Sequence, residues 1–375
     1  MSDTWDVVIV GAGIVGAACA AACAAGGFRT AVVESGPVGG GATAAGMGHI
    51  VAMDDSPAQL ALTRYSQKLW QALAPCLPAR VEYESCGTLW LARDGEEMEE
   101  ARRKHEVYRS AGIASEILDN RALAEAEPHL RRDLSGALLV PSDAVIYPPC
   151  AAAYLIQEAI RGGAGMFAPC RTLSAREGLV RLDNGVELRA PRLVNAGGAD
   201  AAKLLSELPI RKRKGHLVIT DRYPGFVQHQ LVELGYLKSA HSLSTDSVAF
   251  NVQPRRTGQI LIGSSRQYDA EDSDVDHAIV SAMIDRAQTF IPELGRLSAI
   301  RVWTGFRAAT PDKLPLIGPW PEDGTVFIAS GHEGLGITTS LATAQLLVDY
   351  MLGRDTAIPL DPYLPQRFTG SAAHA

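Results

Sequence analysis

Trp5-Asp-Val-Val-Ile-Val-Gly-Ala-Gly-Ile-Val-Gly16 is the part of the sequence that predicts the fold of this chain most clearly. Residues 6–10 are rich in β-branched side chains, a composition typical of a buried strand in a parallel sheet. Three glycines follow in the spacing G-x-G-x-x-G, and the Ala-rich residues 17–25 then predict a helix that ends at Gly26 and Gly27. A strand that passes through such glycines into a helix predicts an α/β domain that binds a dinucleotide.

Each glycine of this motif has its own physical task. Gly11 permits the tight turn, Gly13 lets the backbone approach a pyrophosphate, and Gly16 lets the helix pack closely on the strand. The helix N-terminus then presents unpaired N–H groups and a partial positive charge to the phosphates. A second expected strand, residues 29–34, ends on Glu34, about 20 residues further on, where a ribose-binding carboxylate is expected.

Length, charge and cysteine usage limit the class of protein. At 375 residues and 47% hydrophobic content, the chain can bury a large core and is long enough for two domains. Its net charge of −7 argues against a nucleic-acid partner, which would require a basic face. The first residues lack the pattern of a signal peptide, and no apolar run approaches the ~20 residues that span a bilayer. The six cysteines show no metal-ligand spacing, so we expect no metal site and a cytoplasmic protein, peripheral to a membrane only through a complex.

Further glycine-rich segments divide the chain into interleaved domains. Residues 35–48 follow the ribose-binding strand, which favours a cofactor-wrapping loop over a flexible linker. Residues 193–198 and 325–336 repeat the passage from strand to glycines, with strand-rich sequence between them. We therefore expect a discontinuous Rossmann-like domain (residues 1–80, 150–210 and 307–365) and an α+β substrate domain on a mostly antiparallel sheet (residues 81–149 and 211–306).

Local patterns predict several other elements. Helices are expected over residues 60–73, 96–110, 151–161, 278–290 and 337–352. Residues 81–91 are expected to form a strand, and residues 140–149 to be extended, because each proline pushes its predecessor out of the helical region. Residues 180–193 predict a hairpin that turns at Asp183-Asn184-Gly185.

In their order along the chain, these motifs resemble the D-amino-acid oxidase superfamily of FAD enzymes. The resemblance rests on the first glycine motif, on the loop 39–48, and on the segments Asn195–Gly198, Trp303–Gly318 and Gly331–Gly336, and it covers essentially the whole chain. Within the superfamily the chain is similar to the glycine oxidase branch. The phrases Gly46-Met-Gly-His49, Arg213-Lys-Gly-His-Leu-Val-Ile-Thr220 and Gly263-Ser-Ser-Arg266 look closest to the FAD subunits of D-hydroxyproline dehydrogenase, opine oxidase and hydrogen cyanide synthase.

The resemblance implies a non-covalently bound FAD. The first glycine motif would hold the pyrophosphate, Glu34 the adenosine ribose, and the backbone of Thr172 the adenine. Residues 46–48 would lie along the flavin, and the helix that starts near Gly336 would point its positive N-terminus at the pyrimidine edge, which stabilises reduced flavin. The residues expected to contact the cofactor are Gly11, Ala12, Gly13, Ile14, Val15, Gly16, Glu34, Ser35, Gly41, Ala42, Thr43, Gly46, Met47, Gly48, Thr172, Ala196, Gly197, Gly331, His332, Gly334, Leu335, Gly336, Ile337 and Thr338.

The resemblance also implies a substrate site. Arg307 matches the arginine that binds the substrate carboxylate, a task suited to the guanidinium fork, whereas the alternative is a surface arginine in an ion pair. His49 is a candidate catalytic residue and His332 a candidate substrate contact, and each could equally be a structural histidine. Asn251 falls roughly where glycine oxidase has a substrate-facing tyrosine, which argues against an identical specificity. The basic run 211–214 is interpreted as a solvated edge or a partner contact.

Together these expectations define a function. The chain would be an FAD-dependent enzyme that transfers a hydride from a small amino or imino acid, with D-proline or cis-4-hydroxy-D-proline as leading substrates, to flavin and so forms the imine. It would be the catalytic subunit of a multisubunit dehydrogenase whose partner subunits carry further redox centres. The alternatives are a stand-alone glycine, sarcosine or D-amino-acid oxidase that produces hydrogen peroxide, and a non-catalytic flavin-binding subunit.

Overall fold

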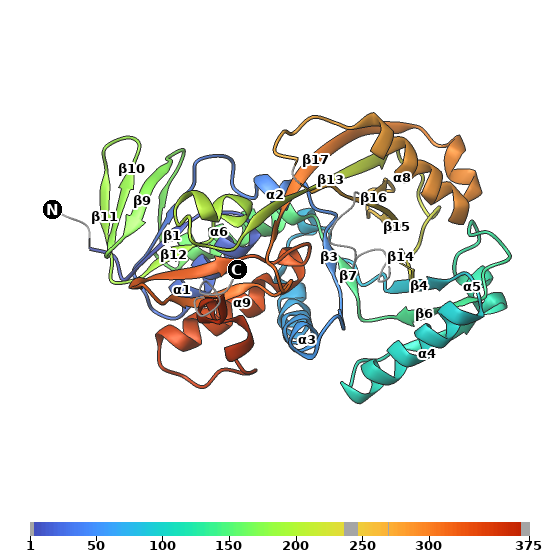
Figure 1. Cartoon of the computed structure of the whole chain (residues 1–375), viewed down its shortest axis with the longest axis horizontal. Coiled ribbons are helices and arrows are strands. Elements are labelled where there is room, and N and C mark those ends of the chain that lie inside the picture. Colours follow the sequence, from blue (N-terminus) through green and yellow to red (C-terminus); the bar gives the residue numbers. More distant parts are fainter. Residues whose placement is uncertain (1–3, 236–246, 269, 369–375) are drawn as a thin grey trace. The chain divides into compact units, whose positions relative to one another are not determined.

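A computed structural model describes residues 4–235, 247–268 and 270–368 (Figure 1). The chain divides into two compact units. The first contains Met1–Val81, Tyr147–Lys212 and Phe306–Ala375, and the second contains Glu82–Ile146 and Arg213–Gly305. Each unit is built on its own main sheet, and the chain passes from one unit to the other four times.

The first unit is organised around a six-stranded sheet. Its strand order is β18 (Leu316–Trp320), β19 (Asp323–Ser330), β12 (Leu193–Asn195), β1 (Val7–Val10), β2 (Thr30–Val33) and β8 (Gly165–Phe167). All neighbours pair in parallel except β18, which lies antiparallel to β19 at one edge. The valine and isoleucine side chains of β1 are buried, as expected for a strand with helices or loops on both faces.

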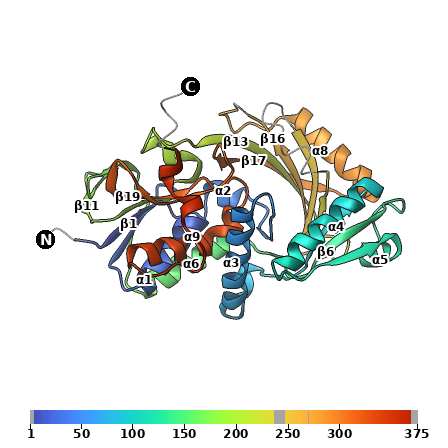
Figure 2. The ribbon, with the colours of Figure 1, turned by 60° about the horizontal axis from the view of Figure 1, so that its bottom comes forward.

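Helix α1, which follows the first glycine motif, lies at the centre of the helix packing in this unit. Helix α1 (Ile14–Ala25) packs against both α6 (Pro148–Arg161) and α9 (Gly336–Met351), and α9 also packs against α3 (Pro57–Leu73) (Figure 2). The small residues of α1 allow this close approach, since Ala17 and Ala20 are fully buried. The unit also contains α2 (Gly41–Ala44), β3 (His49–Ile50) and a small sheet of β9 (Thr172–Arg176), β10 (Leu179–Leu182) and β11 (Glu187–Arg189).

The second unit is organised around an eight-stranded sheet. Its order is β17 (Ala299–Ala309), β13 (Arg211–Thr220), β16 (Ile260–Arg266), β15 (Ser247–Pro254), β14 (Gln230–Glu233), β4 (Thr88–Ala92), β6 (Gly136–Val140) and β5 (Glu116–Asp119). Strands β14 and β4 pair in parallel, whereas β13–β16, β14–β15, β15–β16, β4–β6 and β5–β6 pair antiparallel. The unit also contains α4 (Gly95–Ser110), α5 (Asn120–Ala126), β7 (Ala144–Val145) and α8 (His277–Phe290).

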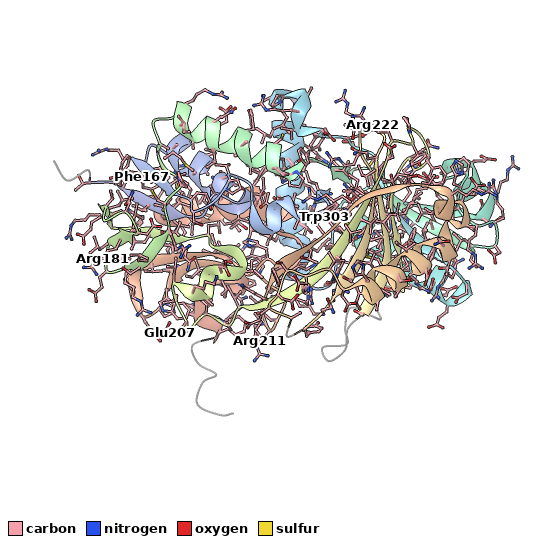
Figure 3. All side chains as sticks on the ribbon, turned by 90° about the horizontal axis from the view of Figure 1, so that it is seen from above. Phe167, Arg181, Glu207, Arg211, Arg222 and Trp303 are labelled. Carbon is pink, nitrogen blue, oxygen red and sulfur yellow. The ribbon has the colours of Figure 1, made fainter. Side chains whose placement is uncertain are left out.

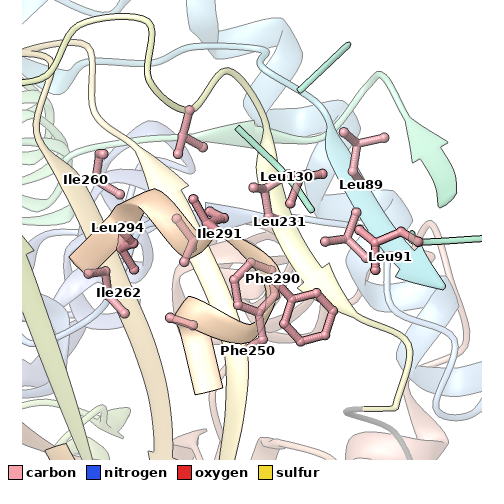
Figure 4. Close-up of a cluster of buried hydrophobic side chains, with 14 of the residues drawn as sticks. Leu89, Leu91, Leu130, Leu231, Phe250, Ile260, Ile262, Phe290, Ile291 and Leu294 are labelled. Carbon is pink, nitrogen blue, oxygen red and sulfur yellow. The ribbon is translucent and has the colours of Figure 1, made fainter. Parts of the chain in front are cut away.

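One hydrophobic cluster joins this sheet to α8. Phe250 of β15 stacks on Phe290 of α8 with 4.3 Å between ring centroids, and both rings are buried (Figure 4). Leucine and isoleucine side chains of the neighbouring strands complete the cluster, among them Leu89, Leu231 and Ile262. The alternation of side chains along each strand therefore gives the sheet an apolar face under α8.

The predicted fold class is confirmed, and so is the hairpin, which turns between β10 and β11. Two local expectations are corrected. The strand expected over residues 81–91 begins only at Thr88 and runs to Ala92, and Val81 belongs to a 3₁₀ turn over residues 79–81 instead. Pro148 and Pro149 begin helix α6 instead of continuing an extended segment, because the first helical turn does not need their missing N–H groups. No helix in the part of the chain that the structure describes is long and apolar enough to cross a membrane.

Candidate functional site

The glycine turn between β1 and α1 is packed so tightly that two of its positions require glycine. A Cβ on Gly11 would stand 2.6 Å from the carbonyl oxygen of Ala196, and φ of Gly11 is +106°. A Cβ on Gly16 would stand 2.0 Å from the carbonyl oxygen of Gly11. The N–H of Ala196 donates to the carbonyl of Val10 at 2.9 Å. The first and second glycine segments are therefore held directly against each other, leaving bare backbone at the start of α1.

Thr43 of the following loop supplies the cap that this helix start lacks. The N-cap residue Gly13 has no side chain, and the hydroxyl of Thr43 accepts a hydrogen bond from the N–H of Ile14 at 2.9 Å. The N–H of Gly39 donates to the carbonyl of Ala12 at 2.8 Å. The loop thus lies over the N-terminus of α1, where a pyrophosphate would bind.

Glu34, at the end of β2, is hydrogen-bonded to the same glycine turn. One carboxylate oxygen accepts from the N–H of Ala12 at 2.7 Å and the other from the N–H of Gly36 at 2.7 Å. The backbone of Glu34 also bonds to Phe167 and Cys170, which brings the start of β9 close to it. The Oγ1 atom of Thr172 in β9 is buried and has no hydrogen-bond partner among the described residues.

The third glycine segment meets the first at the start of α9. A Cβ on Gly336 would lie 3.8 Å from the side chain of Val15 and 3.4 Å from His332. A Cβ on Gly46 would stand 2.8 Å from Cδ1 of Ile337. The N–H groups of the first turn of a helix have no partner within the helix, so α9 offers a second positive helix end beside the glycine loop.

These contacts fit FAD. Close-packed glycines that no side chain can replace, together with the N-termini of two long helices, form a cradle suited to an elongated cofactor that carries negative charge. The structure brings together the expected residues of the three glycine segments, Glu34 and Thr43 within the first unit. The expectation that each of them touches the cofactor stays a prediction.

Arg307 lies beside the third glycine segment. It is at the end of β17, and its Cδ and Nε atoms lie 3.7 and 3.6 Å from the point where a Cβ of Gly334 would stand. The N–H of Glu333 donates to the carbonyl of Ala308 at 2.9 Å, in an isolated antiparallel bridge. The strand end that carries the half-buried Arg307 is thus tied to the loop that contains Gly334.

The three other candidate residues have different surroundings. His332 is buried, its Nε2 lies 2.9 Å from Oγ1 of Thr343, and burial lowers its pKa to about 3, so its ring is neutral. His49 is half-buried in β3, and its carbonyl accepts a hydrogen bond from Thr338. Asn251 is buried in β15 of the second unit, where it pairs with Val232 and Gly263. The substrate roles of all three stay predictions.

The basic run 211–214 is divided between the surface and the interior of the protein. Arg211 is exposed (Figure 3), but Lys212 forms an ion pair with Asp200 at 2.9 Å. Arg213 is buried and donates to the hydroxyl of Tyr268. Lys214, also buried, forms an ion pair with Asp272 at 2.8 Å. The expectation of a solvated edge was therefore wrong for Arg213 and Lys214, and the alternative of a partner contact stays a prediction for the exposed Arg211.

Sequence reasoning missed two residues of helix α3 that hold α9. Nε1 of Trp70 donates to the carbonyl of Thr338 at 3.2 Å, and the hydroxyl of Ser66 accepts from the N–H of Ala342 at 3.2 Å. Both side chains are fully buried. The helical periodicity of this segment signals a buried face, but it does not identify its partner. Within the described ranges, no group of histidine, cysteine and acidic side chains could hold a metal ion.

Comparisons with known proteins agree with this geometry. Residues 6–350 match the model of the family described as FAD dependent oxidoreductase. The chain is 30% identical to a glycine oxidase of Geobacillus kaustophilus, with 99% of each chain covered. It is also 30% identical to the hydrogen cyanide synthase subunit HcnC of Pseudomonas aeruginosa, with 98% of this chain and 97% of that protein covered.

Solved structures show the same fold. The crystal structure of glycine oxidase from Geobacillus kaustophilus superposes with a TM-score of 0.87 at 27% identity, covering 97% of this chain and 99% of the other. L-proline dehydrogenase from P. horikoshii superposes with a TM-score of 0.89 at 23% identity, covering 99% of each chain.

Proposed function

The chain belongs to the FAD dependent oxidoreductase family, and from that premise we propose that it oxidises a small amino or imino acid to the imine, with D-proline or cis-4-hydroxy-D-proline as the leading substrates. Similarity to a glycine oxidase over nearly the whole chain supports an amino acid as the substrate class. The preference for a cyclic D-imino acid rests on the local sequence phrases around residues 46–49, 213–220 and 263–266.

The position of Arg307 carries this proposal. Its side chain lies against Gly334, in the loop that precedes α9, and the expected flavin would lie beside that loop. A guanidinium can bind a carboxylate through two parallel hydrogen bonds, which fixes both the position and the orientation of the substrate. With the carboxylate fixed, the hydrogen on the α-carbon would face the cofactor in one orientation only.

Other residues would set the electrostatic environment of the bound flavin and substrate. FAD, when bound, supplies the acceptor for the hydride that leaves the α-carbon. The N-terminus of α9 favours negative charge beside it. His332 stays neutral, so it does not compete with Arg307 for the carboxylate. The substrate amine must be neutral before oxidation, because its lone pair forms the imine bond.

Arginine substitutions test the proposal. Arg307→Ala removes both hydrogen bonds to the carboxylate, so we expect KM for an amino-acid substrate to rise roughly a hundredfold. Arg307→Lys keeps the positive charge but loses the two parallel N–H donors of the guanidinium, so its KM should lie between those of the wild type and Arg307→Ala. Arg301→Ala is the matched control, because Arg301 is exposed on the same strand and stacks over Trp303.

A substrate pair sharpens this test. The wild type should prefer D-proline over its amide, whereas Arg307→Ala should oxidise the two equally slowly. An unchanged KM in Arg307→Ala, or a retained preference for the acid, would contradict the assigned role.

We infer further that the chain passes its electrons to partner subunits that carry other redox centres. Similarity to a hydrogen cyanide synthase subunit supports this, because that protein is by name one part of an assembly. Similarity to glycine oxidase favours the competing function, a stand-alone oxidase of glycine, sarcosine or a D-amino acid. The rate of hydrogen peroxide formation by the purified chain separates the two. Slow peroxide formation with fast reduction of an artificial dye supports the dehydrogenase, and fast peroxide formation supports the oxidase.

A further inference from the structure

The hydroxyl of Thr338 joins two segments that are far apart in the sequence. It donates a hydrogen bond to the carbonyl of His49 at 2.8 Å and accepts one from the N–H of Val51 at 3.3 Å. Thr338 is fully buried in the first turn of α9. The glycine loop that ends at Gly48 is therefore fastened to the N-terminal turn of the helix.

Two further contacts hold this junction. The carbonyl of Thr338 accepts a hydrogen bond from Nε1 of the fully buried Trp70. On the loop side, Gly46 packs so closely on Ile337 that a Cβ would approach within 2.8 Å. The hydroxyl, the carbonyl and the neighbouring side chain thus all fix the same turn.

We propose that Thr338 is a positioning residue, which locks the glycine loop to the start of α9 and so holds both walls of the flavin site in place before the cofactor binds. This inference rests on the cofactor site proposed above. A threonine hydroxyl has one proton, and Thr338 donates it to His49. Its side chain therefore acts through the backbone segments that it fastens.

The two hydrogen bonds of the Thr338 hydroxyl have two measurable consequences. Without the hydroxyl, the carbonyl of His49 and the N–H of Val51 each lose one hydrogen bond. The loop is then less ordered before FAD binds, and binding must supply that order. We expect the Kd for FAD to rise about tenfold, which corresponds to ~1.4 kcal/mol. A less well fixed helix N-terminus also stabilises reduced flavin less, so the midpoint potential should become more negative.

Three variants separate this role from a general loss of packing. Thr338→Val keeps the shape and removes the hydroxyl, and Thr338→Ser restores the hydroxyl. Thr339→Val is the matched control, because the Thr339 hydroxyl donates only to Leu335 in its own helix turn. Trp70→Phe removes the donor to the Thr338 carbonyl and provides a second route if Thr338→Val does not fold. FAD titration of the apo-protein, the midpoint potential and apo-protein thermal unfolding are measured for each.

The expected result is a weaker FAD affinity and a more negative potential in Thr338→Val, smaller changes of the same sign in Trp70→Phe, and near wild-type values in Thr338→Ser and Thr339→Val. If Thr338→Val and Thr339→Val lower the unfolding temperature alike and leave affinity and potential unchanged, the proposal is overturned. Agreement of Thr338→Ser with Thr338→Val would also overturn it. None of these measurements requires a substrate, so failure of the proposed substrate class would not affect them.

Discussion

The carboxylate of Glu34 accepts a hydrogen bond from the backbone N–H of Ala12 at 2.7 Å. The acid at the end of β2 therefore holds the glycine turn at the end of β1, in addition to its expected contact with the adenosine ribose. Its second oxygen is bonded to the N–H of Gly36. Any change at Glu34 should thus alter both the ribose contact and the shape of the turn.

Glu34→Gln should weaken FAD binding about tenfold, because an amide can replace one accepting oxygen only and loses the charge that strengthens both bonds. The measurement is fluorescence titration of the apo-protein with FAD. Glu207→Gln serves as the control, since Glu207 is an exposed carboxylate of the same unit that forms an ion pair with Arg176 and is not among the residues expected to contact the cofactor. Equal affinities in Glu34→Gln and the wild type would show that the carboxylate is not needed for the site.

Gly11→Ala should abolish FAD retention and destabilise the protein by more than Gly27→Ala. Both glycines have positive φ, +106° and +87°, but only Gly11 faces a carbonyl oxygen at 2.6 Å, whereas nothing lies within 4 Å of a Cβ on Gly27. Gly27→Ala then reports the backbone strain alone, roughly 1–2 kcal/mol. Thermal unfolding and flavin content check both variants, and similar losses would contradict the observed packing.

Burial of His332 predicts a pH-dependent stability. Its pKa falls from the ordinary 6.5 to about 3 in the folded protein, so between these values the unfolded chain binds a proton that the folded protein does not. Stability contributed by this residue is complete above pH 6.5 and is lost as the pH falls towards 3, by up to ~1.4 kcal/mol per pH unit.

His332→Gln removes this dependence and can keep a hydrogen bond to Thr343. Urea unfolding at fixed FAD, at about pH 7.5 and about pH 5, should therefore show a smaller loss of unfolding free energy in the variant than in the wild type. Parallel losses in the two proteins would mean that His332 is already protonated or accessible in the folded state.

The sequence was sufficient for the fold class, the family and the FAD cofactor, which are confirmed, because these depend on local patterns. The passage from a strand into G-x-G-x-x-G depends on a few adjacent residues. The same holds for the hairpin turn that contains Gly185. The surroundings of the basic run were not predictable in the same way. Burial of Lys214 depends on Asp272, far along the chain, and no local pattern connects the two residues.

The same limit applies to the candidate site. The glycine spacing and the acid at position 34 can be read from the sequence. The hydrogen bonds from Thr338 to His49 and from Trp70 to Thr338, in contrast, join residues hundreds of positions apart. His332 also illustrates the limit, since its glycine-rich neighbourhood is compatible with a ligand contact or a structural role, and its contact with Thr343 is visible only in the fold. Such contacts are set by the packing of α3 and α9 and appear only in three dimensions.

Anaerobic reduction of the bound flavin by amino acids would show whether the protein oxidises a small amino or imino acid. The visible absorbance of the purified FAD-loaded protein would be followed against D- and L-amino acids, including both prolines and both hydroxyprolines. We expect rapid bleaching by D-proline or cis-4-hydroxy-D-proline and slow recovery when air is admitted. Bleaching by glycine or sarcosine with fast recovery would favour the stand-alone oxidase. If FAD binds but no amino or imino acid bleaches it, the proposed substrate class is contradicted, and a non-catalytic flavin-binding subunit becomes the better description.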